Sequence, residues 1–243
     1  NKFFYSGPMF RRERPQSGRL RQFHQVGVEY IGSKNYLSDV EIILLAEKFL
    51  KDLKIRQKLI LQINSLGNEK SRHNYNISLK KFLEKNKSKL SEISIERLNK
   101  NPLRILDSKE KEDQEVIKDA PNIIDYLDEE SKLFFNEFVS SLDKLKIDYK
   151  LNRFLVRGLD YYNHTAFEYI TTEKKSQNTV LAGGRYNGLI KNLGGKDLSG
   201  VGWAAGIERI QMHLENLKGT EFAVVCVFST DGKLDIEILK MIN

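Results

Sequence analysis

An arginine-rich segment between two runs of strand-forming residues constrains the fold of this chain more than any other feature. Five of its thirteen arginines lie within residues 11–21, although lysine outnumbers arginine about two to one overall. The planar guanidinium group binds phosphate or carboxylate through two parallel hydrogen bonds, whereas the lysine ammonium is a point charge. The choice of arginine therefore predicts a site that recognises anionic oxygens.

The residues on either side of this segment predict an antiparallel β-hairpin. Side chains alternate across a strand, so Met9, Arg11 and Glu13 share one face of the first strand. The second strand spans residues 23–30, and one of its faces carries Phe23, Gln25, Gly27 and Glu29. The long tip, residues 14–22, contains a proline and a glycine that suit turns. One face of the hairpin then presents an arginine, two carboxylates, an amide and an aromatic ring, with a glycine that leaves room for a ligand.

The same pattern has a plainer interpretation, which is the solvated face of a half-exposed sheet. For an ordinary charged strand that interpretation is the more common one. The local preference for arginine and the glycine among the polar residues favour a binding site in this chain.

The composition limits the chemistry that the chain can carry. A net charge of +7 and an isoelectric point near 9.2 suit a polyanionic partner. An excess of lysine, asparagine and isoleucine also arises by drift across a whole proteome, so charge alone indicates nucleic acid only weakly. The single cysteine, Cys226, lies in an apolar run and is expected to be buried in a strand, which leaves no disulfide and no thiolate metal cluster.

Several other classes of site are not expected. The four histidines are scattered without the spacing of metal ligands, so we predict no zinc site and assign no metal ligand to any side chain. No glycine-rich phosphate loop of the P-loop or Rossmann type occurs. No apolar stretch reaches the roughly 20 residues that span a bilayer, and the start of the chain has no signal-peptide pattern. A reducing, aqueous compartment is therefore the expectation.

Composition and periodicity divide the chain into four segments. The first combines the hairpin with a helix and a buried strand, residues 59–64. The second is charged and helical in period, and predicts a mostly helical inserted domain. The third returns to strands and glycine turns, and the fourth begins another α/β unit. The predicted boundaries are residues 1–66, 67–149, 150–219 and 220–243.

The helix of the first segment carries its own start signal. Residues 38–41 read Ser-Asp-Val-Glu, which is the pattern of a capping box. The sequence therefore predicts a helix that opens at Ser38 with its serine side chain as the cap, and that runs to about Leu53.

Three segments of the later core carry further candidate residues. Residues 155–163 contain Arg-Gly-Leu-Asp-Tyr-Tyr, residues 182–186 read Ala-Gly-Gly-Arg-Tyr, and residues 200–210 form a small-residue strand that leads into a helix. Arg209 lies at the start of that helix, where free N–H groups favour anions. Together with the hairpin, these segments resemble the histidyl-tRNA synthetase family of class II aminoacyl-tRNA synthetases. The hairpin resembles motif 2, residues 200–210 resemble motif 3, and the other two resemble the histidine-specific signatures.

The resemblance implies an α+β fold: a six- or seven-stranded antiparallel sheet flanked by helices, with an active site on its open face. It implies histidine–tRNA ligase activity, in which ATP and histidine form histidyl-adenylate and histidine is then transferred to the 3′ end of tRNA(His). ATP and Mg²⁺ are the implied cofactors, and tRNA(His) is the implied partner. A homodimer in the cytoplasm, without membrane contact, is also implied.

The resemblance also assigns roles to individual residues. The implied catalytic residues are Arg11 and Arg157, on opposite sides of the α-phosphate. The implied ATP-binding residues are Arg11, Glu13, Phe23 and Arg209. The implied histidine-binding residues are Gln25, Glu29, Arg157, Tyr161, Tyr162 and Tyr186. The candidates for contact with the tRNA acceptor end are Arg19 and Arg21.

The chain departs from the family pattern in two ways. Leu181 and Asn187 stand where the family commonly has cysteine and aspartate. The chain begins next to motif 2, without motif 1, and ends at what resembles the start of an anticodon-binding domain. We therefore expect a fragment of an enzyme of about 400 residues, since a domain of about 100 residues would complete the C-terminal part. Such a fragment need not be active alone.

Two other functions compete with this one. The synthetase-like regulatory subunit of ATP phosphoribosyltransferase shares the catalytic fold, but it would be expected to have eroded site residues and to lack the helical insertion. A general RNA-binding module would explain the charge and the arginines, yet it would not require Gln25, Glu29 and Tyr162 together. Such a module would lose RNA affinity steeply with salt and would gain nothing from ATP and histidine.

Overall fold

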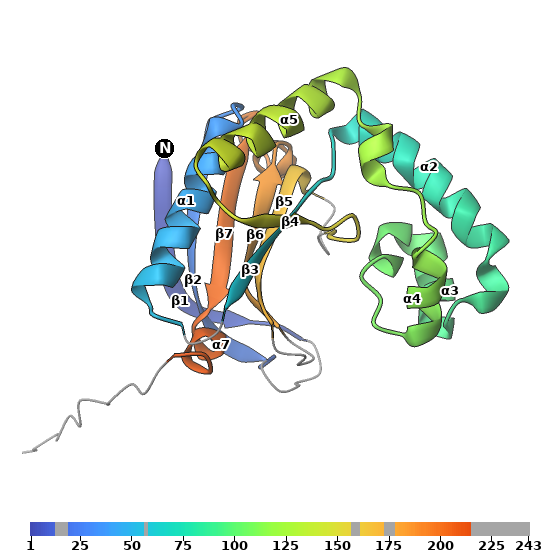
Figure 1. The fold of residues 1–243 in the computed structure, drawn as a ribbon, viewed down its shortest axis with the longest axis horizontal. Coiled ribbons are helices and arrows are strands. Elements are labelled where there is room, and N and C mark those ends of the chain that lie inside the picture. Colours follow the sequence, from blue (N-terminus) through green and yellow to red (C-terminus); the bar gives the residue numbers. More distant parts are fainter. Residues whose placement is uncertain (13–18, 56–57, 157–160, 173–177, 215–243) are drawn as a thin grey trace, which may run out of the picture.

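A seven-stranded sheet forms the centre of the part of the chain that the structure describes. The computed structural model describes residues 1–243 except 13–18, 56–57, 157–160, 173–177 and 215–243. The strand order is β1-β2-β7-β6-β5-β3-β4 (Figure 1). The strands are β1 Lys2–Phe10, β2 Gln22–Ile31, β3 Leu59–Ser65, β4 Tyr149–Leu151, β5 Asn163–Thr171, β6 Thr179–Tyr186 and β7 Gly200–Gly206. Every neighbouring pair is antiparallel except β3 with β4. The expected α+β fold with its antiparallel sheet is therefore confirmed.

The first two strands form the predicted hairpin. Phe10 pairs with Gln22, and beyond this pair the Arg11 amide donates to the Arg21 carbonyl at 2.8 Å. The first strand is longer than the sequence indicated, since β1 begins at Lys2. Glu13 belongs to the part of the tip that lies outside the described residues. The predicted last segment, residues 220–243, also lies outside them, and Cys226 with it.

Two helices cover one face of the sheet (Figure 1). Helix α1, Leu37–Asp52, and helix α5, Glu129–Lys144, bury apolar side chains in one hydrophobic core together with the sheet. That core includes Ile43 from α1, Phe138 from α5 and Phe167 from β5, all with no exposed surface. The side chains of Val26, Val28 and Tyr30 pack against the same core. Because strand side chains alternate, the odd-numbered residues of β2 face the opposite side of the sheet.

The other helices between β3 and β4 form a second core to one side of the sheet (Figure 1). They are α2 Glu69–Lys85, η1 Lys87–Lys89, α3 Glu92–Lys100, η2 Pro102–Ile105, α4 Lys111–Ile117 and η3 Ile123–Tyr126. This core includes Tyr75, Leu79 and Ile105, and it continues into Leu155 and Ala166 next to the sheet. Two short helices, α6 Leu189–Asn192 and α7 Ile207–Gln211, follow β6 and β7.

The packing therefore separates the helices of the predicted insertion. Helices α2 to α4 share their own core, whereas α5 belongs to the core of the sheet, although both fall within the predicted range of residues 67–149. The domain boundaries themselves stay a prediction. Among the described residues, no helix is both long and apolar enough to cross a membrane.

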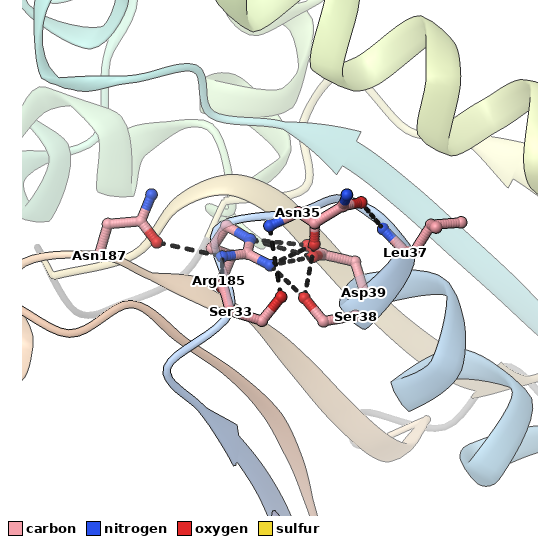
Figure 2. Close-up of polar contacts among 7 residues, drawn as sticks. All are labelled: Ser33, Asn35, Leu37, Ser38, Asp39, Arg185 and Asn187. Atoms are coloured by element: carbon pink, nitrogen blue, oxygen red, sulfur yellow. Dashed lines mark hydrogen bonds and ion pairs between the residues drawn. The ribbon is translucent and has the colours of Figure 1, made fainter. Parts of the chain in front are cut away.

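The predicted capping box at the start of α1 is wrong. The helix begins at Leu37, whose amide donates to Asn35 Oδ1 at 2.8 Å, and its N-cap residue is Tyr36. Ser38 and Asp39 lie inside the first turn, and both side chains are buried. They contact the guanidinium group of Arg185 instead of capping the helix (Figure 2). Ser38 and Asp39, which the local pattern assigned to the helix end, instead accept hydrogen bonds from the buried guanidinium group of Arg185.

Candidate active site

A cavity of about 1110 Å³ lies on the face of the sheet that α1 and α5 leave uncovered. Its floor consists of residues from β2, β6 and β7. Another side is lined by residues from η2, from α4 and from the end of α4, among them Arg104, Gln114 and Lys118. The predicted site residues that line it are Arg11, Arg19, Phe23, Gln25, Glu29, Tyr161, Tyr162, Tyr186 and Arg209. Arg21 is not among the lining residues. Arg157 and Glu13 lie outside the described residues.

At one end of the cavity, Glu29 and Tyr186 form a direct hydrogen bond. The Tyr186 hydroxyl donates to Glu29 Oε2 at 2.6 Å. Burial raises the pKa of Glu29, and the hydrogen bond from Tyr186 acts in the opposite direction. The pKa of Tyr186 is raised well above its usual value, first by burial and then by the bond to Glu29. The tyrosine thus stays protonated and serves as a donor to a partly buried carboxylate.

The strand beside Glu29 makes room for this carboxylate. Glu29 pairs with Gly202 of β7, and a Cβ atom on Gly202 would lie 2.0 Å from Glu29 Oε2. It would also lie 2.3 Å from the carbonyl oxygen of Val28. A side chain at position 202 would therefore force Glu29 out of its present place.

Three tyrosines surround the same end of the cavity. The ring centroids of Tyr161 and Tyr162 are 4.6 Å apart, and both rings meet Tyr186 edge to face, at 6.1 and 6.5 Å. Arg72 of α2 donates to the Tyr162 carbonyl at 2.6 Å, which ties the helical part of the chain to this wall of the site. Flat rings around a carboxylate and a hydroxyl suit a small planar ligand that can donate a hydrogen bond.

At the other end of the cavity, positive charge gathers. Arg11, Arg19 and Arg209 all line this part, and the Arg11 guanidinium carbon lies 3.7 Å from the centroid of the Phe23 ring. Arg209 donates to the Thr179 carbonyl at 2.6 Å. The pKa of Arg209 is lowered, chiefly by burial and also by the charges of Arg11 and Arg19. Because these like charges repel one another, a bound polyanion would be favoured here.

The glycine in the hairpin does not leave room for a ligand, so this expectation is wrong. Gly27 pairs with Tyr5 of β1, and a Cβ atom on Gly27 would lie 2.4 Å from the Tyr5 ring. The Tyr5 side chain fills the space and lines the cavity itself. Burial is the main cause that raises the pKa of Tyr5, with a further contribution from Glu29. Sequence reasoning missed Tyr5 because it considered the alternation of the first strand only from Met9 onward.

The Arg185–Tyr186 pair is divided between the two faces of β6. Tyr186 faces the cavity, whereas Arg185 is fully buried on the helix side of the sheet (Figure 2). Arg185 Nε donates to both carboxylate oxygens of Asp39, at 3.1 and 3.0 Å. Its remaining donors reach Ser33 O, Asn35 O, Ser38 Oγ and Asn187 Oδ1. Asn187, which departs from the family pattern, is thus an acceptor for Arg185 at 3.3 Å.

Sequence reasoning did not assign a role to some other residues of the site. Glu208 lines the cavity next to Arg209, and its carboxylate accepts hydrogen bonds from the backbone amide of His24. The α4 residues at the rim come from a distant part of the chain. No spacing rule connects such positions, so only the tertiary structure could identify them.

The described residues hold no group of three or more histidine, cysteine, aspartate or glutamate side chains placed to bind a metal ion. Two carboxylates, Glu168 and Glu208, line the cavity near the arginines. Because both oxygens of Glu208 accept the His24 amide, Glu168 is the candidate carboxylate for a hard cation that enters with a phosphate ligand, and the arrangement does not fit a closed protein cage.

A family model and curated relatives assign this chain to the same protein family. The family model described as Histidyl-tRNA synthetase matches residues 1–210. The Histidine–tRNA ligase of Rhodospirillum rubrum is 53% identical over 211 residues, which cover 87% of this chain and 51% of that protein. The chain therefore spans about half the length of the curated relatives it matches.

Solved structures agree with this result. Apo histidyl-tRNA synthetase from S. aureus superposes with a TM-score of 0.68 at 38% identity, covering 87% of this chain and 50% of that one. A Bacillus halodurans protein described as an ATP phosphoribosyltransferase regulatory subunit/histidyl-tRNA synthetase gives 0.60 at 19% identity, over 88% of this chain and 59% of that one. At that level of identity the second match shows a shared fold alone.

Proposed function

Because this chain belongs to the histidyl-tRNA synthetase family, we propose that it carries the amino-acid activation site of a histidine–tRNA ligase. The observation that carries the proposal is a single cavity with a carboxylate–tyrosine pair at one end and three arginines at the other. A small aromatic amino acid and a triphosphate would occupy these two ends at the same time.

In the proposed reaction, the carboxylate of histidine attacks the α-phosphorus of ATP and pyrophosphate leaves. No protein nucleophile is needed, so the protein contributes orientation and neutralisation of charge on the phosphate oxygens. Arg11 would bind the α-phosphate and Arg209 the γ-phosphate. Arg157 would approach the α-phosphate from the other side, and Glu13 would contact the adenine; both roles stay predictions because these residues lie outside the described part of the chain.

The nucleotide base would stack on Phe23. In the ligand-free cavity the Arg11 guanidinium covers one face of this ring at 3.7 Å. Adenine that stacks on the same face would displace Arg11 toward the phosphates, where its fork of donors fits two phosphate oxygens. Stacking of the base and movement of the arginine would therefore accompany each other.

Histidine would bind between Glu29 and the three tyrosines. A carboxylate accepts a hydrogen bond from an imidazole N–H, which an apolar side chain of the same shape cannot do. Gln25 would contact the backbone groups of the amino acid, and Tyr161, Tyr162 and Tyr186 would enclose the ring.

The remaining parts of the proposal follow from the family. Mg²⁺ would be held chiefly by phosphate oxygens and would neutralise the departing pyrophosphate. Histidine would then pass to the 3′ end of tRNA(His), with Arg19 and Arg21 as candidates for contact with the acceptor end. We also propose that the whole enzyme is a cytoplasmic homodimer.

The main alternative is the regulatory subunit of ATP phosphoribosyltransferase. The similarity that mentions such a subunit is at 19% identity and bears on the fold alone. Retention of Arg11, Gln25, Glu29 and Arg209 in one cavity favours the ligase.

Histidine-dependent exchange between ATP and pyrophosphate tests the proposal. The assay would use this chain and a version extended at both ends to the length of its relatives. Each of the other amino acids would be tested in place of histidine. We expect exchange that requires histidine, that collapses in Arg157→Ala and that persists in Arg97→Ala. Arg97 is a matched control because it lies on α3 and does not line the cavity. Effector binding without exchange by the extended protein would support the regulatory subunit instead.

A further inference from the structure

Glu208 and Arg209, two consecutive residues at the start of α7, bind the two strands that flank β7. In the sheet, β7 lies between β2 and β6. Glu208 Oε1 and Oε2 accept hydrogen bonds from the backbone amide of His24 in β2, at 2.8 and 3.0 Å. Arg209 donates to the backbone carbonyl of Thr179, the first residue of β6, at 2.6 Å. The helix is thereby fixed to both neighbouring strands at its first turn.

The bond from Glu208 extends the pairing of β2 beyond the end of the backbone ladder. The register between β2 and β7 ends at the pair of Gln25 with Gly206. The His24 amide is the next donor along β2, and the side chain of Glu208 accepts it where a β7 backbone carbonyl is no longer available. His24 stands between Phe23 and Gln25, which both line the cavity.

From this geometry we infer that Glu208 is a positioning residue, which holds Arg209 at a fixed place relative to Phe23 and thus presets the phosphate end of the cavity. This inference rests on the proposed function, because it concerns the binding of the nucleotide in that same site. Glu208 acts through the backbone of His24 and through the start of α7, and it does not itself contact the substrate.

The exposed part of the contact adds little to this role. Glu208 Oε1 also lies 3.0 Å from His24 Nδ1, but the His24 side chain is 54% exposed. Ion pairs at such exposed positions contribute little because water and salt screen them. The backbone amide is therefore the partner that matters.

The experiment compares Glu208→Ala, Glu208→Gln and His24→Ala. Kinetics of pyrophosphate exchange would give KM for ATP at saturating histidine and KM for histidine at saturating ATP. We expect Glu208→Ala to raise KM for ATP about tenfold, with KM for histidine changed less than about twofold, because one charge-assisted hydrogen bond is lost. Glu208→Gln should recover most of the affinity, since its amide oxygen still accepts the His24 amide. His24→Ala should behave almost as the unmodified chain does.

Three results would overturn the inference. An unchanged KM for ATP in Glu208→Ala would show that Arg209 needs no such support. Equal damage in Glu208→Gln, together with a higher Mg²⁺ requirement, would mean that the negative charge acts on a cation. A similar increase in KM for both ATP and histidine, together with a lowered melting temperature, would indicate that Glu208 is a purely structural residue.

A binding measurement separates this inference from the proposed function. Calorimetric titration with ATP and Mg²⁺ reports nucleotide affinity without any reaction. If the version extended at both ends gives no exchange, the proposed function fails, whereas an affinity for ATP that depends on Glu208 as described would still support the positioning role.

Discussion

At the residue scale, the hydrogen bond from Tyr186 to Glu29 favours the ionised form of a carboxylate inside the cavity. Burial raises the pKa of Glu29, and the Tyr186 hydroxyl, 2.6 Å away, offsets part of this effect. A protonated Glu29 would be a poorer acceptor for an imidazole N–H. The tyrosine therefore favours the ionised form of Glu29, which is the form that the proposed ligand needs.

Replacement of Tyr186 by phenylalanine tests this relation. Without the donor, the pKa of Glu29 rises further. As the pH is lowered, the variant should therefore lose its affinity for histidine at a higher pH than the unmodified chain does. We expect KM for histidine to increase about tenfold near neutral pH, with KM for ATP nearly unchanged. KM for histidine measured between pH 5 and 8 checks this, with the unmodified chain as the reference for titration of the substrate itself. Superimposable pH profiles for the two proteins would contradict the role given to Tyr186.

Single residues divide into those that local rules could predict and those that they could not. Alternation along one strand was enough to place Phe23, Gln25 and Glu29 on one face. Tyr5 and Glu208 join the same cavity through strand pairs and helix contacts that no spacing reveals. Their positions depend on the register between segments far apart in the chain, and this is set by tertiary packing.

At the scale of elements, a buried ion pair joins α1 to β6. Arg185 and Asp39 are both fully buried, and the loop before α1 supplies further acceptors from Ser33 and Asn35 (Figure 2). A guanidinium group without its carboxylate partner in such a place is strongly unfavourable. The pair therefore fixes the start of α1 against the strand that carries Tyr186.

The variant Asp39→Asn should lower the free energy of unfolding by about 3–5 kcal/mol, because it leaves the charge of Arg185 buried without a counterion. Asp52→Asn on the same helix is the matched control. Asp52 pairs with Lys48 at 3.0 Å, but both side chains are largely exposed. Its loss should cost less than about 0.5 kcal/mol. Urea unfolding followed by circular dichroism measures both, and equal losses in the two variants would contradict the importance of burial.

The elements show where pattern reasoning fails. The hairpin and the strand after α1 were predictable, because their alternation and apolar runs are local properties. The start of α1 was not predictable, since Ser38 and Asp39 bind the guanidinium group of Arg185, which is distant in the sequence, and do not cap the helix. Helix α5 was grouped with the charged insertion by composition, although Phe135 and Phe138 pack in the core of the sheet.

At the scale of the whole molecule, a buried histidine couples folding to pH. His164 is 7% exposed, and its pKa is lowered from 6.5 to about 4, mainly by burial and also by the charge of Arg185, while Asp128 acts in the opposite direction. The folded state needs the neutral ring, whereas the unfolded chain takes up a proton near pH 6.5. Stability from this residue is therefore complete above about pH 6.5 and is lost as the pH falls toward 4.

Comparison with His164→Asn isolates this contribution. Asparagine tolerates the positive φ of 45° at this position better than most residues. Between pH 7 and pH 4, the unmodified chain should lose about 3 kcal/mol more stability than the variant. Denaturant unfolding at several pH values provides the measurement. Parallel losses in the two proteins would place the acid sensitivity in other groups.

The site as a whole could be predicted only in part. Motif segments indicated the cavity floor on β2, β6 and β7, but its rim includes Arg104, Lys109 and Lys118 from the helical part. The approach of this part to the sheet rests on contacts such as that of Arg72 with the Tyr162 carbonyl. Such contacts join independent cores, so neither core predicts them alone.

The central claim is that one cavity binds the amino acid and the nucleotide together. Calorimetric titration of this chain with a non-hydrolysable analogue of histidyl-adenylate tests it most directly. We predict saturable binding of one analogue per chain, far tighter than binding of histidine or AMP alone, and weakened by both Glu29→Ala and Arg209→Ala. Equal affinity for the corresponding phenylalanyl analogue, or binding unaffected by Glu29→Ala, would contradict the account.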